Sequence, residues 1–204
     1  MRLPRLQALA IAVLLSACGA ASSGPGSTDP TMAPPVVTVP AADGPVTGVG
    51  TVIEKPGRPP ELCLGPVAES WPPQCEGTPL SGWDWAQHPP EQQTEPGGPL
   101  TRWGTYAVTG TFDGVTLTVS GAVPLARYHT MAGPTPTPVT PPDLDAGEWD
   151  AVLGAVRAAP GLLSAERADP GPVQLAVVHD DGSVQAWADA SFGVGAVVVT
   201  SALR

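Results

Sequence analysis

The chain has 204 residues, with 19 acidic and nine basic side chains and a formal net charge of −10 at pH 7. A negative charge of this size repels nucleic-acid phosphates and anionic lipid headgroups, so we do not expect a nucleic-acid-binding protein. The acidic residues are scattered along the sequence, which indicates a solvated surface and argues against a metal site.

The N-terminal stretch MRLPRLQALAIAVLLSACGA has the layout of a secretory signal. Arg2 and Arg5 make a positively charged start, the mostly apolar run from Leu6 to Leu15 follows, and small residues come after it. This apolar run is too short to span a membrane as a helix. We therefore expect residues 1–17 to be a signal peptide that is removed from the mature protein.

The residues Leu15-Ser16-Ala17-Cys18 resemble the lipobox of bacterial lipoproteins. In that family a diacylglycerol is attached to the cysteine sulfur, and the signal is cut just before the cysteine. The resemblance implies that diacylglycerol on Cys18 anchors the protein to the extracytoplasmic face of the cell membrane. Two acyl chains are enough for stable anchoring, because each buried CH₂ contributes about 0.8 kcal/mol. The alternative is that Cys18 is an ordinary small residue near an ordinary cleavage site.

Residues 18–46 would begin the mature chain as a tether. Cleavage removes Arg2 and Arg5, which leaves seven basic against 19 acidic residues and a net charge of −12. The segment after Cys18 is rich in Gly, Ala, Ser, Thr and Pro and has few large apolar side chains, so we expect disorder. A flexible tether of about 28 residues spans about 30 Å, enough to lift a folded module off the bilayer.

Two cysteines, Cys63 and Cys75, remain once Cys18 carries the lipid. An even pair in an exported chain indicates a disulfide. Closing a loop of about 13 residues stabilises the fold by roughly 3 kcal/mol in the chain-entropy model. The alternatives are a redox-active pair and a zinc site. A zinc site needs about four ligands, whereas no CxxC pair is present and the nearest histidine in sequence is His88.

Residues 47–128 are predicted to form a β-rich module. Short β-prone runs lie at 47–54 and 61–64, and alternation over 103–125 around Asp113-Gly114 predicts a hairpin. Because an isolated hairpin is not stable, the earlier strands must pair with it. A small closed or nearly closed barrel, specifically an OB-like barrel, would leave no exposed sheet edges.

Three tryptophans follow the first strands of this module, at Trp71, Trp83 and Trp85. The favoured interpretation is structural: they cover a core that is short of Phe and Leu, while Pro72-Pro73 stiffens the connection. The alternative is an aromatic platform for a sugar, peptide or lipid headgroup. If residues 83–85 form a strand, the side chains of Trp83 and Trp85 point to one face.

Residues 129–142 end in a proline-rich run and are predicted to be an extended linker. Residues 143–204 are then predicted to form a second, α+β module with the order α-β-β-α-β, which resembles half of a ferredoxin-like fold or a circular variant of one. Asp145 and Glu148 resemble a capping box before an amphipathic helix. The later elements expected are strands at 162–168 and 173–179, a short helix closed by Phe192-Gly193, and a strand at 195–200. About 60 residues barely bury a core alone, so docking on the first module would help to stabilise this one, but the sequence does not tell whether the two modules dock.

The three histidines give no catalytic motif. His88 lies in a proline-rich stretch, His129 at a predicted domain edge, and His179 next to Asp180-Asp181 at the end of a strand. No GxSxG, SxxK, helical His/Glu metal motif or phosphate-binding glycine loop accompanies them. The group around His179 is the best acid/base or metal candidate, although a solvated turn explains it better. We expect no enzyme activity, no cofactor and no metal.

Several motifs in residues 47–125 resemble those of a group of uncharacterised actinobacterial lipoproteins and secreted proteins. The shared pattern comprises Leu62-Cys63-Leu64-Gly65, Pro72-Pro73-Gln74-Cys75, Gly82-Trp83-Asp84-Trp85 and Val108-Thr109-Gly110-Thr111-Phe112-Asp113-Gly114. The resemblance implies an exported location and carries no activity with it. We therefore expect a non-catalytic binding or scaffolding role at the cell envelope. The alternatives are a small-ligand carrier that uses Trp71, Trp83 and Trp85, and a hydrolase of envelope polymers.

Overall fold

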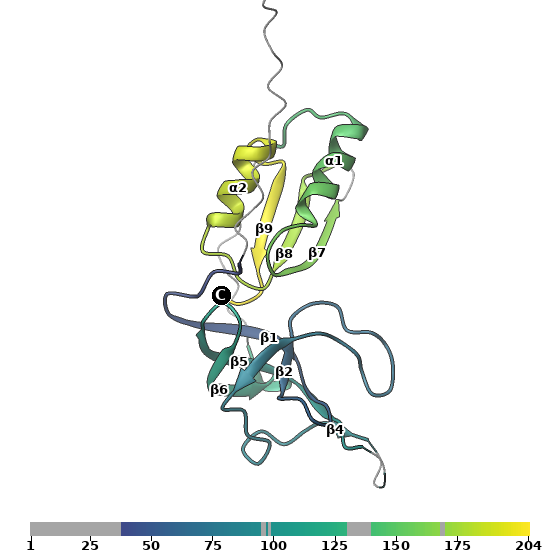
Figure 1. The fold of residues 1–204 in the computed structure, drawn as a ribbon, viewed down its shortest axis with the longest axis vertical. Helices are drawn as coiled ribbons and strands as arrows, with labels where there is room; N and C mark the ends of the chain where they lie inside the picture. Colours follow the sequence, from purple (N-terminus) through teal and green to yellow (C-terminus); the bar gives the residue numbers. More distant parts are fainter. Residues whose placement is uncertain (1–37, 95–96, 98, 130–139, 168–169) are drawn as a thin grey trace, which may run out of the picture. The chain divides into compact units, whose positions relative to one another are not determined.

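A computed structural model of the chain describes residues 38–94, 97, 99–129, 140–167 and 170–204. The fold is mixed α+β, mostly sheet, with two α-helices and one disulfide in these residues, which confirms the predicted class (Figure 1). The predicted signal peptide, the lipobox with Cys18, most of the tether and most of the proline-rich linker lie outside the described residues.

The β-rich module has one six-stranded sheet, and a short 3₁₀ helix follows the last strand of this sheet. These elements are β1 (Pro45–Glu54), β2 (Glu61–Cys63), β3 (Thr78–Ser81), β4 (Gln92–Gln93), β5 (Arg102–Phe112), β6 (Leu117–Pro124) and η1 (Leu125–Arg127). β1 pairs antiparallel with both β2 and β5, β2 pairs antiparallel with β3, and β5 pairs antiparallel with β6. β3 and β6 are parallel neighbours, and the short β4 pairs with β5. The sequence predicted the regions of β1, β2, β5 and β6 but not β3 or β4.

The inner side of this sheet holds a core formed by alternate strand residues. Its buried members are Val46, Val52, Leu62, Leu80, Trp85, Tyr106, Val108, Phe112, Leu117 and Leu203. Two glycines let the strands approach closely: a Cβ at Gly50 would lie 2.1 Å from the backbone oxygen of Cys63, and one at Gly110 would lie 2.1 Å from that of Thr118. Gly110 also sits at the irregularity in the β5–β6 register.

The predicted hairpin is present, with a longer loop than a two-residue Asp-Gly turn. β5 ends at Phe112 and β6 begins at Leu117. The Asp113 carboxylate accepts hydrogen bonds from the backbone N–H groups of Val115 (2.9 Å) and Thr116 (2.7 Å). Gly114 has φ of 97°, in the left-handed region that favours glycine. The loop is therefore held by Asp113 from inside.

The second region has the predicted order α-β-β-α-β. Its elements are α1 (Ala146–Val156), β7 (Leu162–Arg167), β8 (Val173–Val177), α2 (Ser183–Phe192) and β9 (Val197–Ser201). β7 and β8 are antiparallel, and β8 and β9 are parallel. Because β9 pairs directly with β8, the order β7-β8-β9 has no strand between the two parallel strands, unlike the split unit of a ferredoxin-like fold.

Both helices of this region cover the same face of its sheet. The buried cluster combines α1 and α2 residues with alternate residues of β8, namely Val173, Leu175 and Val177. The predicted capping box is present: the Asp145 carboxylate accepts the Glu148 N–H at 2.8 Å, and the Glu148 carboxylate accepts the Asp145 N–H at 2.7 Å. Local hydrogen bonds therefore define where α1 begins.

The last two residues of the chain join the first sheet. Thr47 N–H donates to the Arg204 carbonyl at 2.8 Å, and Arg204 N–H donates to the Thr47 carbonyl at 3.3 Å. Leu203 is fully buried in the core of the β-rich module. A Cβ at Gly48 would lie 2.7 Å from the Leu203 side chain, so the glycine makes room for it. The C-terminal residues, which follow β9, thus contact β1 and the core of the β-rich module.

Candidate binding surface on the stapled loop

The predicted disulfide between Cys63 and Cys75 is present, with a Cα–Cα separation of 6.1 Å. It ties the end of β2 to a connection of residues 64–77, here called the stapled loop, that leads to β3. Within this loop Ala68 N–H donates to the Gln74 carbonyl at 2.9 Å, and the Ser70 hydroxyl donates to the Pro72 carbonyl at 2.9 Å. The loop tip is therefore fixed by a covalent bond and by its own hydrogen bonds.

The stapled loop covers a second, outer cluster of apolar residues. Ile53, Cys63 and Trp103 are buried there, and Val67 and Cys75 pack against them. Ile53 and Trp103 are cross-strand partners on β1 and β5, so they share one face of the sheet. Val52 belongs to the inner core, so the neighbouring Ile53 points to the outer side of the sheet. Without the stapled loop over it, the Ile53 side chain would be exposed to water. The staple therefore buries apolar surface on the outside of the sheet.

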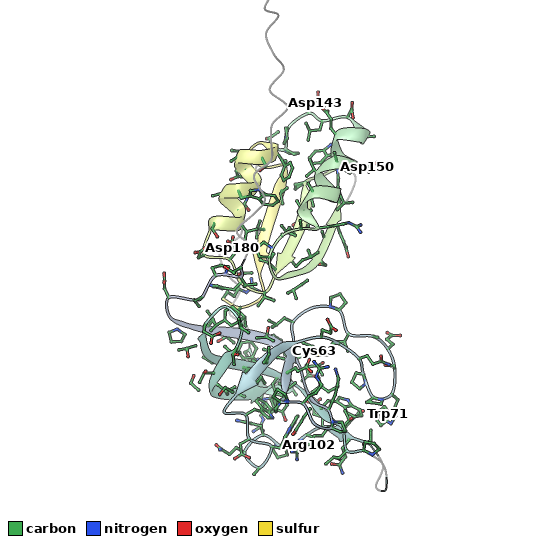
Figure 2. All side chains as sticks on the ribbon, viewed as in Figure 1. Cys63, Trp71, Arg102, Asp143, Asp150 and Asp180 are labelled. Carbon is green, nitrogen blue, oxygen red and sulfur yellow. A yellow bond between two sulfur atoms is a disulfide. The ribbon has the colours of Figure 1, made fainter. Side chains whose placement is uncertain are left out.

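Trp71 lies at the tip of the stapled loop and is 67% exposed. Its ring packs edge-on against Trp103, with ring centroids 4.9 Å apart and planes at 80°. Figure 2 shows Trp71 at the outer margin of the β-rich module. The favoured interpretation, in which Trp71 covers the core, is therefore wrong for this residue: its ring contacts Trp103, and most of its surface faces solvent.

Trp83 and Trp85 belong to the inner core region, not to the outer cluster around Trp71. No strand is present at 83–85: residues 83 and 84 are irregular and 85–87 form a turn, so the two side chains do not share a strand face. The two rings nevertheless meet, in a T-shaped pair with centroids 5.3 Å apart. Trp83 also contacts Tyr106 at 5.0 Å and His88 at 4.9 Å.

Trp85 is buried and engaged through its indole nitrogen. Its Nε1–H donates to Oε2 of Glu54 at 2.5 Å, and Arg102 Nε donates to the same oxygen at 2.9 Å. The Arg102 guanidinium lies 5.4 Å from the Trp85 ring centroid. The alternative interpretation grouped Trp71, Trp83 and Trp85 as one ligand-binding platform. Of these three, only Trp71 is mostly exposed to solvent: Trp85 is buried and Trp83 is half-buried.

A charged group that sequence reasoning missed lies beside the stapled loop. Glu61 is only 3% exposed; its Oε2 accepts the Gly77 N–H at 3.0 Å. Its Oε1 lies 3.4 Å from Arg58 Nε and 4.0 Å from Lys55 Nζ. Lys55 Nζ also donates to the Cys75 carbonyl at 2.8 Å. The signals in the sequence were a unique lysine and the three-residue spacing of Arg58 and Glu61.

An open hollow of about 620 Å³ lies between the β1–β2 turn, the stapled loop and the start of β5. Its lining residues are Lys55, Pro56, Arg58, Pro72, Pro73, Gln74, Cys75, Glu76 and Thr101. Trp71 is not among these lining residues, but it directly precedes Pro72, which is, and its ring packs on Trp103, two residues after Thr101. Trp71 and the lining residues of the hollow are here together called the stapled-loop surface.

The group around His179 is used for local structure. His179 is buried, and its Nδ1 lies 3.0 Å from the Leu203 carbonyl. Asp180 accepts N–H groups of Gly182 and Val184 at the start of α2. The neighbouring Ser183, whose backbone N–H donates to the Asp181 carboxylate at 3.0 Å, holds the pKa of that carboxyl below its ordinary value. In the described part of the chain, no three His, Cys, Asp or Glu side chains are grouped to hold a metal ion.

Neither α1 nor α2 is long or apolar enough to cross a membrane, and the described residues include no other helix that is. Comparisons of the chain with family models, with curated proteins and with solved structures found no match.

Proposed function

We propose that the protein is a lipid-anchored lipoprotein of the extracytoplasmic face of the cell membrane, with a non-catalytic binding role exercised through the stapled-loop surface. The observation that carries the proposal is Trp71, 67% exposed on a loop that the Cys63–Cys75 disulfide holds in place. Large aromatic side chains are the residues that most often dominate binding energy when a partner covers them.

The exposure of Trp71 to water supports a binding role, because an exposed tryptophan lacks the favourable free energy of burial. Trp is highly buried on average, and a buried aromatic ring contributes a large apolar area. The module keeps Trp103 and Trp85 buried at 7% and 8% exposure, so it has interior positions for such rings. A Trp left outside on a rigid loop gains that burial only when a partner is present. Rigidity also reduces the ordering cost of binding.

The anchoring part of the proposal rests on the sequence. Arg2, Arg5, the apolar run and Cys18 support a lipoprotein signal, and the composition of residues 18–46 supports a tether. A disulfide is typical of an exported protein, which agrees with a location outside the cytoplasm. A surface-anchored binding module needs no more than such a tether to reach a partner in the envelope.

We further propose that β1, β2, β3, β6 and β5 form an OB-like barrel. The proposal is supported by the pairings, which pass from β1 through β2, β3 and β6 to β5, while β5 also pairs with β1. Five strands in a Greek-key arrangement are the architecture of the OB-fold. An experimental structure of the protein tests this, and an open sheet with β1 and β5 unpaired would contradict it.

A small-ligand carrier is the second candidate, and the hollow of about 620 Å³ beside Trp71 favours it. Ligand sites in proteins commonly have about 300–1,000 Å³. In this version the site comprises Trp71 and the hollow, while Trp83 and Trp85 support the core behind it.

Native mass spectrometry of the protein extracted from its own membrane in mild detergent tests the anchor and the carrier together. The expected mass is that of a chain beginning at Cys18 with a diacylglycerol and two hydrogens fewer than the reduced form. A co-purifying small mass favours the carrier, and a clean lipidated protein favours a macromolecular partner. An unlipidated chain cut at another residue would overturn the anchoring proposal.

A photo-crosslinking amino acid at position 71 in intact cells tests the binding surface. We expect crosslinks to an envelope component from position 71. The matched control is position 194, where Val194 is 68% exposed in the α+β module. Equal crosslinking from both positions, or none from position 71, would contradict a binding role for the stapled-loop surface.

A further inference from the structure

We propose that the hollow beside Trp71 is a saccharide subsite that takes a neutral oligosaccharide. The inference deepens the proposed function, on which its envelope setting rests, by naming the class of ligand. It is carried by three observations: the mixed lining of the hollow, the internal balance of its charges, and the exposure of Trp71, which directly precedes the lining residue Pro72 in the chain.

The lining of the hollow has the dual character of a sugar ring. Prolines 56, 72 and 73 offer rigid apolar surface, while Gln74, Glu76 and Thr101 offer polar side chains. A pyranose has apolar C–H faces and a girdle of hydroxyl groups that both donate and accept hydrogen bonds. Lys55 and Arg58 add donors, Glu76 adds an acceptor, and the Gln74 amide and Thr101 hydroxyl can do both.

The charges at the hollow argue against an anionic ligand. Lys55 and Arg58 face the buried Glu61 carboxylate, at 4.0 Å and 3.4 Å respectively, and Lys55 also donates to the Cys75 carbonyl. Glu76 adds a second carboxylate to the lining. Two cations and two carboxylates leave no net positive charge, within a chain whose formal net charge is −10. A phosphate or carboxylate ligand would lack a charge partner of its own.

Trp71 supplies the stacking surface that sugars require. In its T-shaped pair with Trp103, at least one face of the Trp71 ring is free of Trp103, and 67% of the residue is exposed. The electron-rich face of an indole ring attracts groups with partial positive charge, such as the C–H bonds of a pyranose face. The next residues in the chain, Pro72 and Pro73, line the hollow, and the proposal is that an oligosaccharide extends from the hollow to the Trp71 ring.

The subsite is held in shape before any ligand arrives. The disulfide fixes one end of the loop, and the hydrogen bond from Lys55 to the Cys75 carbonyl joins the loop to the β1–β2 turn. Arg58 N–H donates to the Lys55 carbonyl at 3.1 Å and closes that turn. A preorganised site loses little conformational entropy on binding, which matters for weak ligands such as neutral sugars.

The test is a titration of the full chain, purified in mild detergent, with four tetrasaccharides. Three are neutral: the β-1,4-linked N-acetylglucosamine, glucose and mannose tetramers. The fourth is the acidic tetramer of galacturonic acid. Saturation-transfer NMR detects binding, and tryptophan fluorescence gives the affinity. We expect at least one neutral tetramer to bind more tightly than the acidic one. Trp71→Ala should weaken its binding by about tenfold or more, as for an anchor residue.

Three further variants separate a stacking role from a structural one. Trp71→Phe should restore part of the affinity, because an aromatic face returns. Gln74→Ala, at an exposed position in the lining, should weaken binding without changing the thermal midpoint. Val194→Ala, exposed in the α+β module, is the matched control and should leave the affinity unchanged.

The saccharide proposal is overturned if none of the neutral tetramers binds, if the acidic tetramer binds more tightly, or if Trp71→Ala leaves the affinity unchanged. Its failure is distinct from failure of the proposed function. A lipidated chain that crosslinks to a protein through position 71 but binds no sugar would remove the saccharide and keep the binding surface. A sugar bound by a chain that carries no lipid would do the reverse.

Discussion

The β-rich module and the α+β module are both short of large apolar residues, and they stabilise their sheets in different ways. The first sheet has apolar clusters on both sides: an inner core around Tyr106 and Val108, and the outer cluster of Ile53, Cys63 and Trp103. The second sheet has one main core, made of small aliphatic residues from β8, β9 and the two helices together with Trp149.

The difference lies in the range of the interactions. The outer cluster of the first module exists because a disulfide and a 14-residue loop, residues 64–77, return to the sheet. The second module relies on contacts close in sequence, such as the capping box of α1 and the Asp180 hydrogen bonds at the start of α2. In the first module, the disulfide-bonded loop holds Trp71 in place outside the core. It is therefore the module in which we place the binding surface.

Leu203→Ala is expected to have the largest effect, because it removes a buried contact between the two modules. Leu203 follows β9 in the chain but is fully buried in the core of the β-rich module. Truncation of a buried Leu to Ala lowers the free energy of unfolding by about 2–5 kcal/mol. Urea denaturation followed by near-ultraviolet circular dichroism measures it. Leu125→Ala, at a 40% exposed position, is the control and should change stability little. An equally small effect of Leu203→Ala would mean that the modules are independent.

The double variant Cys63→Ser, Cys75→Ser tests how much the disulfide stabilises the β-rich module. Loss of the cross-link should destabilise the protein by about 3 kcal/mol and loosen the cover over Ile53 and Trp103. Adding reductant to the wild-type chain should produce the same shift of the urea midpoint. The far-ultraviolet helix signal of α1 and α2 should survive at urea concentrations where the Trp103 environment is already lost. Simultaneous loss of both signals would contradict the claim that the disulfide stabilises the β-rich module and that local contacts stabilise the α+β module.

The contrast between the modules also explains which elements could be predicted from sequence. The helix α1, its capping box and the β5–β6 hairpin depend on residues a few positions apart, so local patterns sufficed. β3 was missed because Thr78–Ser81 is short and contains Pro79, and its stability comes from pairing with β2 and with the distant β6. No local pattern contains that information.

The candidate site shows the same limit. The disulfide followed from the parity of the cysteines, whereas Trp71 was named for ligand binding only in the alternative interpretation, and the favoured one had it cover the core. The grouping of Trp71 with Trp83 and Trp85 came from their closeness in sequence, whereas the structure pairs Trp71 with Trp103, 32 positions later. Likewise, Glu61 looked like the polar first residue of a strand. Its burial against Lys55 and Arg58 depends on the fold of the stapled loop.

Asp145→Ala tests the local stabilisation of the α+β module and should have a smaller effect. The substitution removes the side chain that accepts the Glu148 N–H, which leaves a helix donor without its cap. Loss of an N-cap typically costs about 1 kcal/mol. Thermal unfolding monitored by far-ultraviolet circular dichroism measures it. Asp145→Asn is the matched control, since its amide oxygen can accept the same hydrogen bond. If the Asn and Ala variants are equally destabilised, the cap is not the cause.

Acid should weaken the same kind of hydrogen bond in both modules, with the smallest effect of this series. Backbone N–H groups of Thr116 and Val115 hold the pKa of Asp113 below its ordinary value, and Ser183 does the same for the pKa of Asp181. A lowered folded-state pKa means that the ionised form is the one the fold stabilises. Each contribution is therefore complete above the ordinary aspartate pKa of about 3.9 and is lost as pH falls through the lowered value.

Asn variants of these two residues keep an acceptor oxygen and remove the charge. We expect Asp113→Asn and Asp181→Asn to be less stable than the wild type at pH 7, and the difference to shrink as the pH falls below about 4, where the wild-type carboxyls become protonated. Urea midpoints at a series of pH values measure the difference, and carbon-13 NMR of the carboxyl groups identifies the titrating residue. A difference that stays constant into strong acid would show that shape, not charge, holds the hairpin loop and the start of α2. In that case the geometry of these hydrogen bonds, and not the negative charge of the two carboxylates, would stabilise both turns.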